Sequence, residues 1–209
     1  MTRMTSLHRQ APLPVSFFGR PTAEVARDIL GRGLWRRSDD GQVAGGIIVE
    51  AEAYSGPDDP ASHAFRRTPR SEIMYGPPGF AYVYFTYGTH WCANVVCESD
   101  GTAGAVLLRA LEPVEGMEVM ARRRGGVAYD KEGKIKERSL CSGPAKLTQA
   151  LDIDGTLNGC DLRSPLLWIS KGIGPLPDAA VAVTPRVGIN RAAGRLARFI
   201  RKDSPFLSR

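Results

Sequence analysis

The sequence has few of the residues from which metal and redox sites are built. Its 209 residues include three histidines and four cysteines. Cys92 and Cys97 are separated by four residues, a spacing that fits no tight zinc-binding pattern. We therefore expect reduced, mostly buried thiols. A metal site that combines Cys92 and Cys97 with His63 and His90 stays open as the alternative.

Long apolar runs and nucleotide-binding motifs are also missing. No stretch approaches the roughly 18 apolar residues that cross a bilayer, and residues 1–15 contain no apolar segment of a secretory signal. No G-x-G-x-x-G turn follows a predicted strand and no Walker lysine motif occurs, which argues against nucleotide-cofactor folds. We expect a cytoplasmic protein with no membrane partner.

Turn residues and positive charge are plentiful instead. The chain is long enough for one domain whose core buries roughly 70% of the surface of the unfolded chain. Its 23 glycines and 15 prolines favour many turns and a β-rich fold. The net charge of +6 suggests an anionic partner, although many soluble proteins that bind no nucleic acid are equally basic.

Hydrophobic periodicity predicts a mixed α+β fold with more strand than helix and no βαβ alternation. We expect a curled antiparallel sheet flanked by helices, built from residues 14–209 as a single domain, with residues 1–13 as a flexible lead-in. The predicted helices cover residues 22–32 with Thr22 as the cap, 112–124 and 145–153. The predicted strands begin at Leu34, Val43, Phe80 and Ala105 and recur near 167–169 and 180–187, and residues 127–139 are predicted to be a mobile charged segment.

The aromatic stretch GFAYVYFTYGTHW, residues 79–91, predicts a β-hairpin. Alternation over residues 80–86 places Tyr82 and Tyr84 on the same face of a strand. The chain must then reverse at Tyr87 and Gly88, because another apolar run follows. A large aromatic side chain at an exposed turn buries nothing unless it has a partner, so Tyr87 is expected to contact another molecule.

A second alternating stretch carries carboxylates. In IIVEAEAYSGPDDPASHAF, Glu50, Glu52 and Tyr54 share one face of a predicted strand, and His63 follows in a proline-rich loop. These carboxylates are either ordinary solvent-facing groups or part of a hydrolytic pocket near the strand end. Alternation alone does not choose between Glu50 and Glu52 as a catalytic base.

Four segments resemble the alkyladenine DNA glycosylase family. They are VEAEAYSGPDDPASHAFRRTPR, MYGPPGFAYVYFTYGTHWCANVV, AVLLRALEPVEG and LCSGPAKLTQAL, in this order, and the resemblance extends over residues 14 to 208. It implies a fold like the C-terminal domain of formyltransferases, with a protruding β-hairpin that enters the DNA minor groove. It further implies an enzyme that needs no metal or cofactor. We expect a monomer that is associated with the nucleoid in a bacterium, and, because the sequence offers no clear amine nucleophile for lyase chemistry, a monofunctional enzyme.

The implied reaction is the excision of damaged purines from double-stranded DNA. The lesions include 3-methyladenine, 7-methylguanine, hypoxanthine and ethenoadenine, which are flipped out of the duplex and hydrolysed from the sugar to leave an abasic site. By resemblance, Glu52 is the general base and Arg109 orders the catalytic face. The implied lesion-binding residues are Tyr54, His63, Tyr84 and Asn94, of which Asn94 crowds the 2-amino group of normal guanine.

Contacts to the duplex are implied for Tyr87, Thr68, Arg70 and Met74. Tyr87 matches the residue that wedges into the gap left by the flipped nucleotide. The arginines at 66, 67 and 70 and the basic C-terminal tail are candidates for phosphate contacts. Two other classes stay open: a nucleic-acid binder without catalytic activity, and a metal-dependent hydrolase that uses His63, His90 and the cysteines.

Overall fold

Two long antiparallel strands, β2 (Val43–Ser55) and β5 (Gly104–Glu115), form the centre of the sheet in a computed structural model of the protein, which describes residues 7–208. The eight-stranded sheet has the order β3-β4-β5-β2-β1-β6, and β8 pairs with β2 and β7 beside this path. Every pairing is antiparallel. The predicted fold class, a β-rich α+β fold with an antiparallel sheet flanked by helices, is confirmed.

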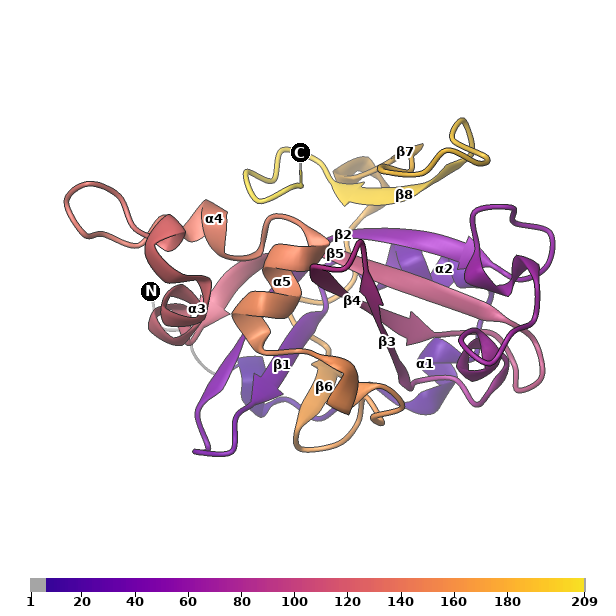
Figure 1. The fold of residues 1–209 in the computed structure, drawn as a ribbon, viewed down its shortest axis with the longest axis horizontal. Coiled ribbons are helices and arrows are strands. Elements are labelled where there is room, and N and C mark those ends of the chain that lie inside the picture. Colours follow the sequence, from indigo (N-terminus) through magenta and orange to yellow (C-terminus); the bar gives the residue numbers. More distant parts are fainter. Residues whose placement is uncertain (1–6, 209) are drawn as a thin grey trace.

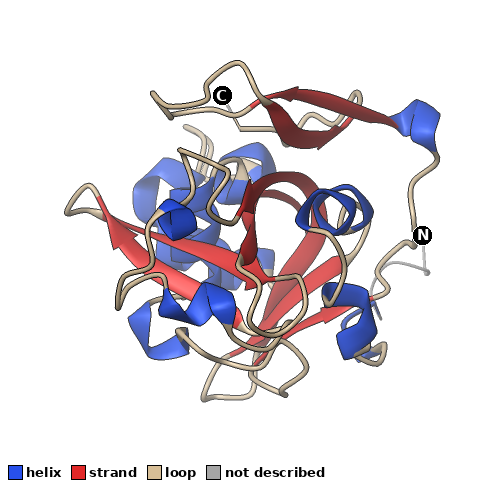
Figure 2. Cartoon of the chain, turned by 90° about the vertical axis from the view of Figure 1, so that its right-hand side faces the viewer, coloured by secondary structure: helices blue, strands red, loops and turns tan. Residues whose placement is uncertain are grey.

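The edge of β2 opposite β5 is shared between two strands. β1 (Gly33–Arg37) pairs with its first half, and β8 (Leu196–Arg201) pairs with residues 50–52 farther along. β8 continues into a two-stranded ribbon with β7 (Val181–Pro185), which lies along one side of the molecule next to β2 (Figures 1 and 2). This fork brings the end of the chain against the middle of β2. The sixth strand, β6 (Leu167–Ser170), pairs with β1.

Helices cover the sheet on both sides. In Figure 1, α5 lies in front of the sheet and α2 behind it, and both contribute buried apolar side chains to the core. The α-helices are α1 (Val15–Phe18), α2 (Thr22–Asp28), α3 (Met117–Arg124), α4 (Glu137–Cys141) and α5 (Pro144–Leu151). The short 3-10 helices are Leu7–Arg9, His63–Phe65, Glu72–Tyr75, Gly125–Ala128, Gly155–Leu157 and Asp178–Ala180.

The predicted hairpin is present, formed by β3 (Ala81–Thr86) and β4 (His90–Val96). Alternation places Tyr82 on one face and Val83 in the main hydrophobic core on the other. At the turn, Tyr87 and Gly88 both have positive φ, 51° and 66°. This sign pattern is typical of the type I′ turns that join twisted strands, and it is uncommon for a residue other than glycine, asparagine or aspartate. The side chain of Tyr87 is 83% exposed at this tip.

Two predicted local features are wrong. The chain over residues 112–115 is strand rather than helix, because it pairs with residues 45–47 of β2 and this long-range pairing overrides local helix preference. The helix begins only at Met117, after Gly116 in a left-handed conformation. Thr22 is not the cap of α2, since Pro21 occupies that position and Thr22 donates its backbone N–H and its hydroxyl to Glu98, each at 2.6 Å.

The N-terminal segment lies against the edge of the sheet where the structure describes it. Leu13 donates its N–H to the carbonyl of Ile169 at 2.8 Å, and Pro12 forms a bridge with Ser170. Residues 1–6 of the expected lead-in, and residue 209, lie outside the described residues. In the segment expected to be mobile, Tyr129 and Ile135 form a bridge and α4 begins at Glu137. Among residues 7–208, no helix has the length and apolar character required to cross a membrane.

Candidate active site

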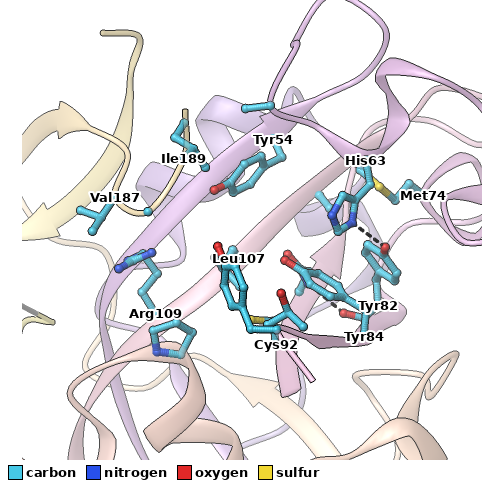
Figure 3. Close-up of a pocket in the computed structure, with 17 residues that line it drawn as sticks. Tyr54, His63, Met74, Tyr82, Tyr84, Cys92, Leu107, Arg109, Val187 and Ile189 are labelled. Carbon is cyan, nitrogen blue, oxygen red and sulfur yellow. Dashed lines mark hydrogen bonds between the residues drawn. The ribbon is translucent and has the colours of Figure 1, made fainter. Parts of the chain in front are cut away.

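A cavity of about 300 Å³ opens where β2, β3, β4 and β5 meet two loops. Its volume is at the lower end of the range for small-ligand pockets, roughly 300–1,000 Å³. Figure 3 shows the 17 residues that line it. They are Tyr54, Ala61, His63, Met74, Tyr82, Tyr84, Thr86, Tyr87, Cys92, Asn94, Ala105, Leu107, Arg109, Pro144, Val187, Gly188 and Ile189.

Aromatic rings form much of the cavity wall. Tyr54 projects from β2, Tyr82 and Tyr84 project from β3, and His63 comes from the loop after β2 (Figure 3). The rings of His63 and Tyr84 meet edge to face with centroids 4.6 Å apart, and Tyr82 lies 5.2 Å from Tyr84. These spacings are typical of attractive aromatic pairs, so the rings hold one another in place and leave a slot suited to a flat ligand.

His63 is a neutral side chain in this wall. Although part of the His63 surface stays exposed, the desolvation of its ring among its aromatic neighbours, followed by the charge of Arg70, lowers the pKa of His63 below its usual value. Its Nδ1 lies 2.8 Å from the hydroxyl of Tyr82, whose own pKa is raised mainly by burial. At neutral pH the imidazole therefore carries no charge, and its orientation is set by this hydrogen bond.

Two buried glutamates lie behind the cavity, and one arginine that lines it contacts both. Glu50 and Glu52, on the same face of β2, are both 0% exposed, so they are not the solvent-facing carboxylates that the sequence left open as an alternative. Arg109 donates from Nε to Glu50 at 2.7 Å, and its Nη1 lies 3.2 Å from Glu52. The register between β2 and β5 shifts next to Arg109, between Glu50 and Ala51, and such bulges redirect side chains. One guanidinium thus bridges both carboxylates.

The two glutamates differ in their remaining partners. Glu50 also accepts from Arg198 Nε at 2.7 Å and from both the backbone N–H and the hydroxyl of Ser208 at 2.6 Å. Burial alone would raise the pKa of Glu50, but the hydrogen bonds from Arg198 and Ser208 and the charge of Arg109 hold it below its usual value. Glu50 is therefore a firmly ionised structural anchor for β8 and the C-terminal tail.

Glu52 instead contacts groups that line the cavity. Its Oε2 accepts from the hydroxyl of Tyr54 at 2.9 Å, and its Oε1 accepts from the backbone N–H of Val187 at 2.8 Å. Burial, together with the charge of Glu52 and this hydrogen bond, raises the pKa of Tyr54 well above its usual value. The Tyr54 hydroxyl stays protonated and directs the carboxylate.

A buried ion pair supports Tyr54 from outside the cavity. Arg186 donates to both carboxylate oxygens of Asp59, at 2.5 and 2.8 Å, and to the carbonyl of Ala53 at 2.9 Å. Its guanidinium carbon lies 4.6 Å from the centre of the Tyr54 ring. The pair ties together β2, the loop that carries His63 and the segment that carries Val187.

Most of the residues predicted from the sequence come together here. Tyr54, His63, Met74, Tyr84, Tyr87, Asn94 and Arg109 all line the cavity, and Glu52 lies directly behind it. Asn94 donates from Nδ2 to the carbonyl of Tyr82 at 3.0 Å, which leaves its amide oxygen available to the cavity. Met74, expected to contact DNA, is 1% exposed, so its placement suits a bound base rather than the outside of a duplex.

Two predicted residues lie outside the cavity. Thr68 borders an adjacent hollow of about 250 Å³ together with Arg66 and Arg191. Arg70 lies over the ring of Tyr84, with its guanidinium carbon 4.7 Å from the ring centre. Both remain candidates for DNA contacts.

Other residues that line the cavity were not predicted from the sequence. Tyr82 and Leu107 could have been found by alternation, since they precede Tyr84 and Arg109 by two residues on the same strands. The segment 187–189 carries no local signal, because only the fold of the β7–β8 ribbon brings it to β2. The same holds for the pairing of Asp59 with Arg186.

The residues considered for a metal site are not assembled. Cys97 lies in the main hydrophobic core, whereas His90 is exposed at the start of β4. Within the described part of the chain, no group of three or more His, Cys, Asp or Glu side chains is placed to hold a metal ion.

Comparison with known proteins agrees with this arrangement. The family model for methylpurine-DNA glycosylase matches residues 16–205. The chain belongs to this family. A protein of Carboxydothermus hydrogenoformans is 47% identical over 94% of this chain and 98% of its own length, and one of Chlorobaculum tepidum is 42% identical over 94% and 90%. Both are named "Putative 3-methyladenine DNA glycosylase".

The family membership defines the class of enzyme. The chain is a DNA glycosylase that acts on alkylated bases in base excision repair, and DNA is its substrate. The resemblance stated from the sequence motifs is therefore confirmed. The cavity, with its aromatic walls and its carboxylate behind them, is the candidate active site of this enzyme.

Proposed function

We propose that this glycosylase flips damaged purine nucleotides out of duplex DNA into the cavity and hydrolyses the N-glycosidic bond with a water molecule activated by Glu52. The base is released and an abasic site remains. The lesions are purines such as 3-methyladenine, 7-methylguanine, hypoxanthine and ethenoadenine. The enzyme binds the minor-groove side of the duplex as a monomer.

The observation that carries the assignment of Glu52 is the difference between the partners of the two glutamates. Glu50 accepts from four donors, three of them on Oε1, and of the residues that supply these donors only Arg109 lines the cavity. Glu52 has three partners, all in residues that line the cavity. A carboxylate offers about four lone-pair sites, so Glu52 retains capacity for one further donor beside the cavity. A water molecule that enters from the cavity fits this remaining site.

Glu52 then has two roles in hydrolysis. Cleavage of a glycosidic bond develops positive charge on the sugar, and a nearby carboxylate stabilises this charge and accepts a proton from the attacking water. Arg109 and the Tyr54 hydroxyl hold the carboxylate in one orientation. Because none of the cavity-lining residues of the described chain is a lysine, we infer that the enzyme has no amine nucleophile for lyase chemistry and is monofunctional.

The aromatic walls account for the choice of substrate. A nucleotide that leaves the duplex loses stacking and pairing energy of a few kcal/mol, and a damaged base loses less because it pairs poorly. Stacking against Tyr54 and Tyr84 returns roughly 1–3 kcal/mol per base. Tyr87 lines the cavity and its side chain is exposed, which supports a role for its ring in filling the gap that the flipped nucleotide leaves.

Excision from a duplex with a single inosine, assayed with EDTA present, tests the proposal. The parent enzyme is expected to release hypoxanthine under these conditions, whereas a metal-dependent hydrolase would not. Glu52→Gln is expected to lose base release by a factor of roughly 10²–10⁴, the usual contribution of a general base, while it keeps near-parent affinity for the duplex. A non-catalytic binder would show binding without release in both proteins.

The neighbouring carboxylate serves as the matched control. Glu50→Gln that retains folding should still release hypoxanthine. Full release by Glu52→Gln, with none by a folded Glu50→Gln, would transfer the catalytic role to Glu50.

A further inference from the structure

Each of the two rings proposed to stack on the base has an arginine on its outer side. Arg186 lies over Tyr54 at 4.6 Å and Arg70 lies over Tyr84 at 4.7 Å, measured from guanidinium carbon to ring centre. Both rings line the cavity, but neither arginine does. The guanidinium groups therefore lie against the ring faces that are turned away from the cavity. A base held between the rings would have a cation behind each of them.

The two arginines differ in how their charge is balanced. Arg186 is buried in a bidentate ion pair with Asp59, so its positive charge is offset within the same site. Arg70 is exposed and donates to the carbonyl of Phe85 at 3.3 Å. Among residues 7–208 it forms no ion pair. The Tyr84 side of the slot thus carries a positive charge without a compensating carboxylate.

The field of Arg70 reaches the groups that line the cavity. Beside burial, which is the larger cause, the charge of Arg70 lowers the pKa of His63. It also opposes the rise in pKa that burial causes at Tyr82, Tyr84 and Cys92. At all four groups, the charge of Arg70 changes the pKa in the direction that a nearby cation produces, because a cation disfavours additional positive charge.

We propose that Arg70 is a specificity-determining residue that disfavours cationic purines, such as 7-methylguanine, relative to neutral purines, such as hypoxanthine. A cation on one face of the ring already interacts with the aromatic quadrupole. It also repels a second cation on the opposite face. This inference rests on the proposed function of the cavity as a base-binding site. It assigns Arg70 a role toward the charge of the base, separate from any contact with DNA phosphates.

The size of the effect follows from the distance. A base stacked about 3.5 Å from the Tyr84 ring would lie about 8 Å from the guanidinium carbon, given its 4.7 Å separation from the ring centre. Two unit charges at this distance, partly exposed to water with an effective dielectric constant of about 40, would shift the preference between a cationic and a neutral base by roughly five-fold.

The test compares single-turnover excision of 7-methylguanine and hypoxanthine from otherwise identical duplexes at saturating enzyme. Arg70→Gln is expected to raise the ratio of the two rate constants, 7-methylguanine over hypoxanthine, by roughly five-fold relative to the parent. Arg70→Lys, which keeps the charge, should stay closer to the parent ratio. A lost phosphate contact would slow both reactions alike and cancel in the ratio.

Arg67 provides the matched control. It lies over the ring of Tyr75 at 4.4 Å, but Tyr75 does not line the cavity and Arg67 is paired with Glu72. Arg67→Gln should leave the ratio unchanged. An unchanged or lower ratio in Arg70→Gln, or an equal rise in Arg67→Gln, would overturn the inference. A parent enzyme that excises neither lesion would instead refute the proposed function, and thermal unfolding of each variant confirms that it is folded.

Discussion

The carboxylate cluster behind the cavity and the tip of the β3–β4 hairpin hold residues with proposed functions in opposite ways. Glu50, Glu52 and Arg109 are at most 6% exposed, and each is fixed by several partners within the protein. Tyr87 is 83% exposed and lies in a left-handed backbone conformation. In the cluster, a side chain that we propose to serve catalysis also contributes to stability. At the tip, the contribution of Tyr87 to stability can be separated from its proposed contribution to DNA binding.

The largest expected effect comes from breaking the cluster at Glu50. Glu50→Gln leaves Arg109 and Arg198 without the carboxylate that both contact, and the loss of one partner from a buried ion pair costs about 3–5 kcal/mol in the free energy of unfolding. Glu52→Gln removes a carboxylate whose only ion pair among residues 7–208 is with Arg109, at 3.2 Å, and should cost about 1–2 kcal/mol. Urea unfolding at neutral pH measures both. Equal losses would show that the two carboxylates are equivalent in the fold.

Acid unfolding sharpens the same comparison. The pKa of Glu50 in the folded protein lies below its usual value of 4.5. Its contribution to stability is therefore fully present above the pKa of the unfolded chain and is lost as the pH falls through the folded-state pKa. The parent should lose stability more steeply below about pH 4.5 than Glu50→Gln does. Parallel curves would mean that Glu50 does not contribute through its charge.

Much of the contrast between the buried cluster and the exposed hairpin tip was predictable from the sequence, because it depends on local periodicity. Alternation on β2 places Glu50, Glu52 and Tyr54 on one face, and the turn at Gly88 exposes Tyr87. Periodicity could not predict the difference between the two glutamates, since their partners are distant in sequence, and only the family resemblance distinguished Glu52 from Glu50. Arg109 is 59 residues from Glu50 and Arg198 is 148 residues away. Such contacts follow from the fork of the sheet at β2.

The errors have the same physical origin. Residues 112–115 have helix-forming neighbours, but pairing with β2 extends β5 through them. Arg186 looks in the sequence like one of many basic residues near the C-terminus, yet it is 5% exposed and paired with Asp59, 127 residues away. Local patterns specify which face a side chain occupies. They do not specify what lies opposite that face.

The next largest effect is expected at the hairpin tip. Tyr87→Ser should fold with a melting temperature near that of the parent, because an 83% exposed side chain buries little apolar surface. It should weaken binding of a lesion duplex and slow excision by the equivalent of roughly 1–3 kcal/mol, the stacking energy of one aromatic ring against a base. Tyr87→Phe should retain most of both, because the ring fills the gap. Thermal unfolding, duplex binding and single-turnover excision measure the three quantities.

A different outcome at the tip would remove the contrast with the cluster. A melting temperature of Tyr87→Ser that is lower by many degrees would show that the ring supports the core. Parent-like binding and excision would show that Tyr87 does not act as a wedge.

The smallest expected effect lies between the two regions, at Asn94. This residue is on β4, 4% exposed, paired in register with Tyr82 of the hairpin and with Leu107 of β5. Its Nδ2 donates to the carbonyl of Tyr82, which fixes the side chain of this cavity-lining residue in one orientation. A fixed side chain of this size can exclude a substituent on a bound purine. The 2-amino group of guanine is the substituent that hypoxanthine lacks.

Asn94→Ser should therefore increase the release of undamaged guanine relative to hypoxanthine. The expected change is up to roughly ten-fold, because the presence or absence of one small group in a pocket is worth about 1 kcal/mol or slightly more. The lost hydrogen bond to Tyr82 should lower the free energy of unfolding by about 1 kcal/mol. Asn94 would thus affect stability and function together, as in the cluster, but weakly. An unchanged guanine-to-hypoxanthine ratio, measured on duplexes that differ only in the target base, would place this discrimination in the energy of nucleotide flipping instead.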